Sequence, residues 1–323
     1  MKNIIDYIKE YGNLTLTDYP FNTIDSLILS QLSYLQYENA NLDIESETHH
    51  LSDFYSEIDT ITNYTRASQN NQSLYLECIN SLRYKDVTIS NFVYNFDEGN
   101  EKQFCAMTFH LPQNIDYIAF RGTDATIVGW KEDFNLSFKL DIPSQLSALH
   151  YVNLHQTNNT LILGGHSKGG NLACYAGAYT RKRIKAIYNH DGPSFLKDPP
   201  KFNTTPIIKT VPQSSIIGLL MEKERNYQVI QSNATSILQH DPFTWIIEDG
   251  DFIYLNDVDN ASKTIQKFIN TILLHTDTKT RERIIDSLFK ILLNTNAKTF
   301  KEITLSSLLI ALKKEDIYKD SSL

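Results

Sequence analysis

The chain has 323 residues, of which 41% are hydrophobic and 21% are charged. This length and composition are typical of a soluble globular protein with a substantial core of its own. The net charge of −8 and the lack of a dense Lys/Arg block argue against a nucleic acid or an anionic membrane surface as the main partner, and no run approaches the roughly 18 apolar residues of a membrane span.

Helical patterns dominate the N-terminal part of the chain. Residues 2–11 form an amphipathic pattern closed by Gly12, and residues 22–38 predict a stronger helix with Asn22 as its N-cap. Residues 40–85 are polar and mixed, and we expect short helices joined by loops there.

Strand patterns follow. Residues 87–96 and 102–111 alternate between apolar and polar residues around the turn 97–101, which predicts a hairpin. Further short apolar runs lie at 115–122, 160–165, 184–189, 206–211 and 227–233. Helical stretches separate several of these runs, and this alternation predicts an α/β protein with a mostly parallel sheet flanked by helices.

The last third of the chain returns to helices. Residues 245–255 predict a hairpin that turns at Asp249-Gly250, and helical patterns follow at 261–275, 279–294 and 305–315. No linker or repeat divides the sequence. We therefore expect one domain over 1–323, with an N-terminal helical region (1–85), a catalytic sheet core (86–256) and C-terminal helices (257–323).

The three cysteines, Cys78, Cys105 and Cys174, are far apart and lack CxxC spacing. Neither a disulfide framework nor a zinc site is indicated, and buried free thiols are expected. The N-terminal residues lack the apolar core of a signal peptide, so the sequence predicts a cytoplasmic protein.

One short motif carries chemistry. Residues 165–169 read GHSKG and match the nucleophile elbow GxSxG, in which a strand turns tightly into a helix and exposes a serine. The apolar run 160–165 precedes Ser167, and a helical pattern with small residues follows it. The alternative is an ordinary glycine-rich turn, but both flanks match the context that a nucleophile needs. Ser167 is therefore the predicted nucleophile.

A serine nucleophile needs a base, and in this fold the base follows the serine in the chain. Three histidines do so: His190, His240 and His275. His275 lies in a helical pattern and His190 comes too early, directly after the next strand. His240 follows the strand 227–233 through a short loop, which is where the base belongs.

The carboxylate that orients the base is less clearly marked. Asp191 follows the strand after the nucleophile helix and is the preferred candidate, although Asp-Gly-Pro is also ordinary turn chemistry. Asp241 is adjacent to His240, and neighbouring side chains rarely adopt the orienting geometry. The strand end at 209–215 carries no carboxylate.

Acyl transfer also requires donors for an oxyanion. The backbone N–H of Lys168 lies at the start of the predicted helix and supplies one donor. A second is expected from the loop after the strand 115–122, where Thr123 stands at the bend.

These residues resemble the fungal-type class 3 lipases, which share the FRGT segment, a downstream Trp and the GHSxGG segment. The resemblance implies that Thr123 supplies an oxyanion-hole hydroxyl and backbone N–H. It also implies that Trp130 belongs to a lid region next to the substrate, and that Asp133 is structural.

A more extensive resemblance, over nearly the whole chain, is to the Mbeg-like proteins, a bacterial family of lipase-like α/β hydrolases. The shared blocks occur in one order and read DYPFNTIDSLILSQLSYL, AFRGTD, GGHSKGGNLA, DGPSF, VPQSSIIGLLM and QHDPFTW. The resemblance implies an α/β-hydrolase fold.

Two features depart from the class 3 pattern. Lys168 stands where that family usually has an apolar residue, and its side chain is expected either to point to solvent, the preferred reading, or to favour acidic substrates. The class 3 acid normally lies one strand later than Asp191. In addition, residues 214–223 predict an apolar helix, read either as a lid or acyl pocket that includes Ile216 and Leu219, or as a core helix.

The sequence therefore predicts a serine hydrolase of a carboxylic ester, most simply a lipid or other acyl ester, that uses Ser167, His240 and Asp191. No metal and no organic cofactor is implied. Acyl transfer and peptide hydrolysis at the same site stay open, as does an inactive hydrolase-like binding protein. A homo-oligomer is compatible with the sequence.

Overall fold

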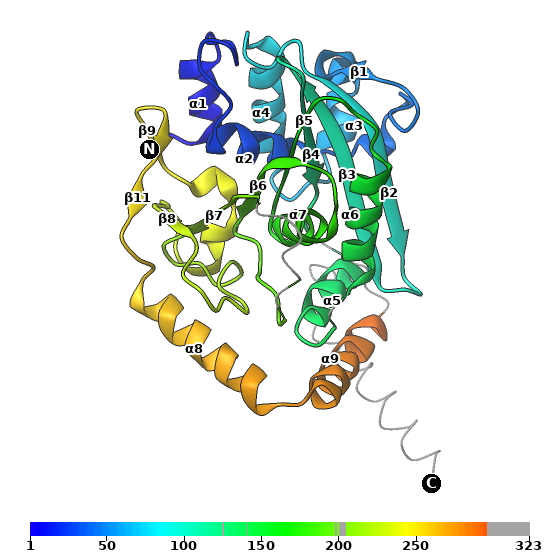
Figure 1. Ribbon diagram of the computed structural model, residues 1–323, viewed down its shortest axis with the longest axis vertical. Helices are drawn as coiled ribbons and strands as arrows, with labels where there is room; N and C mark the ends of the chain where they lie inside the picture. Colours follow the sequence, from blue (N-terminus) through cyan, green and yellow to red (C-terminus); the bar gives the residue numbers. More distant parts are fainter. Residues whose placement is uncertain (125, 140, 198, 200–204, 296–323) are drawn as a thin grey trace.

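The computed structural model describes residues 1–124, 126–139, 141–197, 199 and 205–295 (Figure 1). The strands are β1 His49–His50, β2 Thr88–Asp97, β3 Lys102–Leu111, β4 Ile115–Phe120, β5 Thr160–His166, β6 Ile184–His190, β7 Ile207–Pro212, β8 Gln228–Ile230, β9 Ile247–Glu248, β10 Asp251–Phe252 and β11 Tyr254–Leu255. The α-helices are α1 Ile4–Tyr11, α2 Thr23–Leu32, α3 Ile58–Thr62, α4 Ser68–Asn80, α5 Ile127–Asn135, α6 Pro143–Leu154, α7 Lys168–Tyr179, α8 Asn260–His275 and α9 Thr278–Leu293. Short 3₁₀ segments are η1 Tyr37–Asn39, η2 Leu51–Glu57, η3 Ser236–His240 and η4 Pro242–Thr244.

One large mixed sheet organises the molecule, with the strand order β1-β2-β3-β4-β5-β6-β7-β8-β11. Strands β4 to β8 pair in parallel, whereas β2 and β3 form the predicted antiparallel hairpin at one side of this parallel core. The predicted class, a mostly parallel sheet flanked by helices in an α/β-hydrolase arrangement, is confirmed.

The two faces of the sheet are covered by different parts of the chain. Helices α6 and α7 connect strands that step in one direction along the sheet, and right-handed connections of this kind place their helices on one face. The N-terminal helices α1, α2 and α4 cover the other face, while α8 and α9 lie at the opposite end of the molecule from α1 (Figure 1).

Side chains alternate between these two layers, as the pleat of a strand requires. On β3 and β4, Met107 and Tyr117 belong to the apolar core beneath the N-terminal helices, whereas Ala106 and Ile118 pack against α6 and α7. Both faces of the central strands are therefore buried, which explains why β5 reads as a continuous apolar run.

Local signals set the helix ends in the N-terminal region. Asn22 caps α2 by accepting a hydrogen bond from the Asp25 N–H, while the Asp25 side chain accepts from the Asn22 N–H. This reciprocal capping box satisfies backbone donors that no helical carbonyl reaches. The helix ends at Leu32, earlier than the predicted residue 38.

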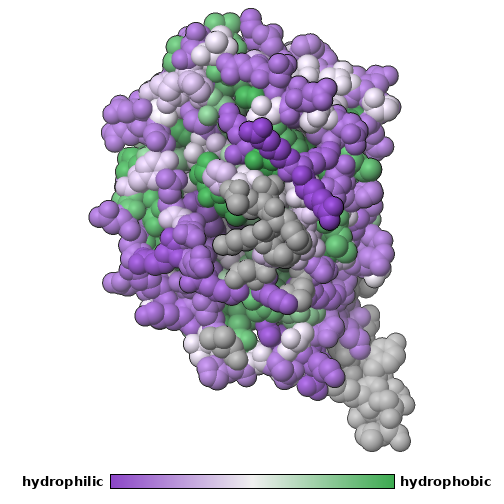
Figure 2. Space-filling model, in the orientation of Figure 1, coloured by the Kyte–Doolittle hydropathy of each residue, from purple (hydrophilic) through white to green (hydrophobic). Residues whose placement is uncertain are grey.

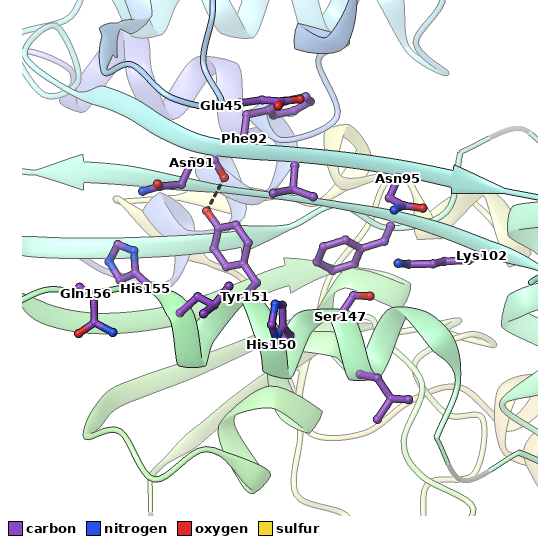
Figure 3. Close-up of a pocket in the computed structure, with 14 residues that line it drawn as sticks. Glu45, Asn91, Phe92, Asn95, Lys102, Ser147, His150, Tyr151, His155 and Gln156 are labelled. Carbon is purple, nitrogen blue, oxygen red and sulfur yellow. Dashed lines mark hydrogen bonds between the residues drawn. The ribbon is translucent and has the colours of Figure 1, made fainter.

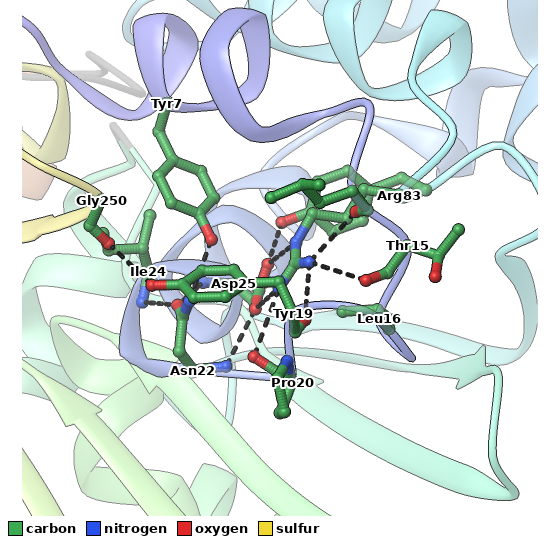
Figure 4. Close-up of polar contacts among 12 residues, drawn as sticks. Tyr7, Thr15, Leu16, Tyr19, Pro20, Asn22, Ile24, Asp25, Arg83 and Gly250 are labelled. Atoms are coloured by element: carbon green, nitrogen blue, oxygen red, sulfur yellow. Dashed lines mark hydrogen bonds and ion pairs between the residues drawn. The ribbon is translucent and has the colours of Figure 1, made fainter.

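Asp25 has a second role in a buried ion pair with Arg83 (Figure 4). Arg83 donates from Nε to Asp25 Oδ1 at 2.7 Å and from the guanidinium to Asp25 Oδ2 at 2.5 Å, and both side chains are fully buried. The Tyr84 hydroxyl donates to the same carboxylate, and Arg83 also donates to the Tyr19 carbonyl at 2.8 Å. These bonds tie α2 to the segment after α4.

Asp25→Asn is expected to lower the free energy of unfolding by about 3–5 kcal/mol, because it leaves the Arg83 guanidinium buried without its counterion. Urea denaturation followed by circular dichroism measures this loss. Lys2→Met is the control, since it breaks the exposed ion pair with Glu10 and should leave the urea midpoint unchanged. Equal midpoints for the Asp25→Asn variant and the wild type would contradict the expectation.

Near the C-terminus, the hairpin predicted at 245–255 is confirmed: β9 and β10 pair antiparallel, and Asp249 and Gly250 both have positive φ at the turn. The predicted helices 261–275 and 279–294 correspond to α8 and α9, whereas the third, 305–315, lies outside the described residues.

The helix predicted at 214–223 does not form. Bends and turns replace it, held by a bond from the Ser215 N–H to the Pro212 carbonyl at 2.9 Å and another from the Gly218 N–H to Ser215 Oγ at 3.1 Å. Met221 has φ +60°, which an α-helix does not allow. The backbone donors are satisfied within turns, so the apolar pattern alone does not produce a helix.

On the face shown in Figure 2, hydrophilic side chains predominate and apolar ones are interspersed among them. Among the described residues, no helix has both the length and the apolar character needed to cross a membrane.

Candidate active site

The nucleophile elbow lies at the carboxyl end of β5, in the middle of the sheet. Ser167 separates β5 from α7 and has φ +59° and ψ −133°, a region that non-glycine residues rarely occupy. The glycines on either side allow the close approach of strand and helix. A Cβ atom on Gly165 would lie 2.3 Å from the carbonyl carbon of Gly169, and one on Gly169 would lie 2.0 Å from the carbonyl oxygen of Phe120.

The structure brings the three predicted triad residues together. His240 Nε2 lies 2.9 Å from Ser167 Oγ, and His240 Nδ1 lies 2.7 Å from Asp191 Oδ2. A carboxylate only accepts hydrogen bonds, so this geometry places the imidazole proton on Nδ1 and leaves Nε2 free to accept from the serine hydroxyl. The arrangement is chemically that of a nucleophile, a base and an orienting carboxylate.

Asp191 is held firmly in this position. Its side chain is only 1% exposed, its backbone N–H donates to the Thr210 carbonyl at 2.8 Å, and Ser215 Oγ donates to Asp191 Oδ1 at 2.5 Å. Both carboxylate oxygens therefore have donors, one from His240 and one from Ser215. Ser215 was not predicted as a site residue, because nothing in the sequence links residue 215 to residue 191.

The loop that carries His240 is held in place by hydrogen bonds to the preceding residue, Gln239. Trp245 is completely buried and donates from Nε1 to the Gln239 carbonyl at 2.7 Å. The Gln239 side chain is buried as well and accepts from the Ser214 N–H at 2.7 Å. Because the residue before His240 is anchored at two points, the imidazole is positioned before any substrate binds.

His166, the residue between Gly165 and Ser167, is a second histidine of the site that the sequence analysis did not single out. Its Nε2 lies 2.8 Å from the His240 carbonyl and its Nδ1 lies 3.1 Å from the Tyr34 hydroxyl. Burial holds the pKa of His166 well below its usual range, so the ring stays neutral. A neutral ring can donate through Nε2 and accept through Nδ1, which supports the backbone of His240.

The loop predicted to bind an oxyanion lies against Ser167. A Cβ atom on Gly122 would lie 3.1 Å from the Cβ of Ser167, so the Arg121-Gly122-Thr123 segment passes directly beside the serine. Arg121 anchors this segment by donating to the carbonyl oxygens of Ser33 and Leu35, each at 2.6 Å. The other predicted donor, the N–H of Lys168, belongs to the first residue of α7, where a helix offers no acceptor of its own.

The Lys168 side chain does not point to solvent, contrary to the expectation. It is 1% exposed, and its Nζ donates to Glu132 Oε2 at 2.9 Å, to the Gln103 carbonyl at 2.8 Å and to Gln103 Oε1 at 2.9 Å. Although burial alone would lower it, the neighbouring carboxylates raise the pKa of Lys168, so the ammonium remains charged. Its charge is therefore used inside the protein and is not exposed to a substrate.

Glu132, the partner of Lys168, is also fully buried and well supplied with donors. It accepts from the N–H groups of Gln103 at 3.0 Å and Ser144 at 2.9 Å, and from Ser144 Oγ at 2.8 Å. These bonds join α5, β3, the start of α6 and the start of α7. Glu132 has no sequence signal as a site residue, because its partner Lys168 lies 36 positions away in the chain.

Thr123 is 3% exposed, and its hydroxyl is hydrogen-bonded to Asp133 on α5. Burial raises the pKa of Asp133 to about 6, although the Lys168 charge and the Thr123 hydroxyl act in the opposite direction. The hydroxyl predicted to bind the oxyanion is therefore also the hydrogen-bond partner of Asp133.

The three residues predicted to contact substrate are not part of this hydrogen-bonded set. Trp130 packs against the apolar cluster of Ile127 and Phe289 that joins α5 to α9, and Leu219 is buried with Val211. Ile216 is partly exposed in the turn region that replaces the predicted helix.

A separate hollow of about 820 Å³ lies between α6 and the β2–β3 hairpin (Figure 3). Its lining includes Phe92, Phe104, Leu146 and Tyr151, and none of the predicted site residues. In the described part of the chain, no group of three or more His, Cys, Asp or Glu side chains is arranged to hold a metal ion.

Comparison with known proteins gives one family and several distant structural relatives. The sequence model of the Mbeg1-like family matches residues 78–290. Among curated proteins, none matches the chain. The fold is similar to that of M37 lipase (11% identity, 60% of this chain and 67% of that chain covered, TM-score 0.36). It is also similar to the lipase from Rhizopus microsporus var. chinensis (17% identity, 72% of this chain and 89% of that chain covered, TM-score 0.35). A third similar structure is Lip2 lipase from Yarrowia lipolytica (10% identity, 58% of this chain and 82% of that chain covered, TM-score 0.31).

Proposed function

The chain belongs to the Mbeg1-like family, and on that premise we propose that it is a serine hydrolase that cleaves a carboxylic ester of a lipid or another acyl compound. The observation that carries the proposal is the continuous hydrogen-bonded chain from Asp191 through His240 to Ser167, with Ser167 in a strained elbow conformation. Structural networks seldom combine an elbow of this kind with a base and its orienting carboxylate.

In the proposed reaction, His240 Nε2 accepts the hydroxyl proton while Ser167 Oγ attacks the ester carbonyl. Asp191 holds the Nδ1 proton and stabilises the imidazolium that forms. The oxyanion lies at the positive end of α7, where it accepts from the Lys168 N–H and from Thr123. His240 then protonates the leaving alkoxide, and a water molecule attacks the acyl-enzyme by the reverse sequence of proton transfers.

The charges near the site leave the stabilisation of the oxyanion to hydrogen-bond donors. The Lys168 ammonium would attract the oxyanion nonspecifically if it were exposed, but Glu132 neutralises it within the core. The stabilisation therefore comes from oriented backbone and hydroxyl donors, which need little reorganisation during the reaction.

Labelling with a fluorophosphonate probe tests the proposal directly. We expect the native protein to gain one adduct mass on the peptide that contains Ser167, because the probe reacts only with a serine activated by its base. The same protein should release p-nitrophenol from p-nitrophenyl esters at rates that change with acyl length. A panel from acetate to palmitate would then report the acyl preference.

The Ser137→Ala variant is the control, since the Ser137 hydroxyl lies outside the proposed triad and donates to the Phe134 carbonyl at 2.7 Å; it should label like the wild type. Absence of labelling in the native protein together with absence of ester turnover would instead favour a hydrolase-like binding protein. An adduct on another residue would remove Ser167 from its proposed role.

A further inference from the structure

The Thr123 hydroxyl can donate one hydrogen bond, and two acceptors compete for it. It is hydrogen-bonded to Asp133 Oδ2, and the proposed reaction requires the same hydroxyl to donate to the oxyanion. An ionised carboxylate can only accept, so it would take the single proton of Thr123. A neutral carboxylic acid can donate to Thr123 Oγ instead, which leaves the threonine proton for the oxyanion.

Asp133 is half-buried, and its surroundings do not supply all the donors that an ionised carboxylate needs. Its second oxygen, Oδ1, is buried and has no hydrogen-bond partner among the described residues. The nearest cation, Lys168, has three N–H donors, and the two acceptors of Gln103 and one of Glu132 occupy all three. An ionised carboxylate with a buried oxygen that lacks a donor is costly, and protonation removes most of that cost.

The charge balance of the cluster also favours a protonated Asp133. The cluster contains two carboxylates, Glu132 and Asp133, and one ammonium, Lys168. Glu132 accepts four hydrogen bonds, one of them from Lys168, and is therefore the carboxylate that keeps its charge. With Glu132 and Lys168 paired, the cluster is neutral only when Asp133 carries a proton.

We propose that Asp133 acts as a neutral carboxylic acid that donates its proton to Thr123 Oγ and thereby turns the Thr123 hydroxyl proton toward the oxyanion. This inference rests on the proposed hydrolase function. Asp133 is a positioning residue, because it acts on the substrate through Thr123. The buried Lys168–Glu132 pair supports it, because Gln103 and Glu132 accept the three Lys168 N–H bonds and none is left for Asp133.

The titration of Asp133 supports this assignment. Burial raises its pKa to about 6, and the groups that face it are Glu132 on its own helix, Lys168 on α7, His240 on η3 and Tyr34 after α2. Of these, Lys168 and His240 lower the pKa and Glu132 raises it. A developing oxyanion raises it further, since a second negative charge nearby disfavours the ionised form. The neutral form therefore prevails below pH 6 and decreases above it.

The pH dependence of Asp133→Asn tests the inference, because an asparagine amide can donate to Thr123 Oγ at every pH. In the wild type, the Thr123 contribution to kcat/KM should fall roughly tenfold per pH unit above pH 6 until the other oxyanion donors dominate. The ratio of kcat/KM for Asp133→Asn over the wild type is therefore expected to rise roughly ten- to a hundredfold between pH 6 and pH 8. p-Nitrophenyl butyrate is the probe, read at the isosbestic wavelength of the product.

A ratio that stays constant with pH would overturn the inference, since a merely structural loss lowers kcat/KM equally at all pH values. Thr123→Val and Thr123→Ser provide a second test that does not require the Asp133 variant to fold. Thr123→Val should lower kcat/KM by roughly 10²-fold near pH 6 and remove the decline above pH 6, whereas Thr123→Ser should keep the decline. A decline that persists in Thr123→Val would also overturn the inference.

These outcomes are distinct from a failure of the hydrolase proposal. If the wild type neither reacts with fluorophosphonate nor hydrolyses an ester at any pH, the proposed function itself fails. If the wild type is active and only the pH profiles disagree, the role of Asp133 alone is wrong.

Discussion

Replacing His240 with alanine is expected to lower kcat for ester hydrolysis by roughly 10⁴- to 10⁶-fold, because Ser167 then loses the base that accepts its proton. Ser167→Ala and the double variant should show the same loss. Two residues that act as one unit give nonadditive effects, since removal of either one already abolishes the step that both perform. The measurement is kcat with the p-nitrophenyl ester that the wild type hydrolyses fastest.

His275→Ala is the matched control for this experiment. His275 is exposed at the end of α8, where its Nδ1 lies 2.7 Å from the Thr271 carbonyl, so the variant should keep the wild-type kcat. Urea midpoints of all variants should confirm that each is folded. If the His240→Ala and Ser167→Ala losses multiply in the double variant, the two side chains do not act in one step.

Asp191→Asn is expected to lower kcat by roughly 10⁴-fold with little change in KM. The asparagine amide presents a donor or a weaker acceptor to His240 Nδ1, which allows the imidazole to carry its proton on Nε2. In that tautomer His240 cannot accept the proton of Ser167, although all the side chains remain in place. A steady-state comparison of kcat and KM measures the effect.

Asp241→Asn makes the same chemical change one residue from His240. Asp241 accepts from the Phe243 N–H at 3.0 Å, and the asparagine carbonyl can accept the same bond. The kcat of Asp241→Asn should therefore stay within roughly threefold of the wild type, because the capping hydrogen bond at residue 241 is kept. A large loss for Asp241→Asn together with a small one for Asp191→Asn would move the orienting role to Asp241.

The residues of one tertiary contact in the site lie in recognisable sequence segments, although the contact itself has no sequence signal. His166 lies inside the GxSxG motif itself, and Tyr34 lies in the N-terminal block shared with the Mbeg-like proteins. Their contact is a consequence of α2 covering the sheet face beneath β5, which brings residues 132 positions apart to 3.1 Å. Nothing in either segment alone specifies that contact.

The segment 214–223 illustrates the limit of apolar patterning. Its sequence has the apolar content of a helix, but Gly218 lies against Asp191, where a Cβ atom would come within 2.2 Å of Oδ1. Ser215 is also drawn to that carboxylate by its hydrogen bond. Hydrogen bonding to Asp191 therefore outweighs helix formation in this segment. A buried carboxylate that lacks donors costs more free energy than a helix of this length would contribute.

The sequence by itself determined the strands of the sheet core, the nucleophile motif and the order of the proposed triad. A strand, a serine with a glycine two residues away on each side, and a helix are specified by nearby residues, so Ser167 was recognisable without any distant contact. The chain order of serine, aspartate and histidine then indicated Asp191 and His240.

Only the tertiary structure decided how charge is distributed around that triad. The burial of Lys168 against Glu132 depends on α5 lying against the start of α7, and the same helix brings Asp133 to Thr123. The Lys168–Glu132 pair joins residues 36 positions apart in the chain, and the energy of a charge depends on whether its partners and the solvent reach it. A local pattern contains neither quantity, so the state of the oxyanion loop could be inferred only once these side chains were placed in space.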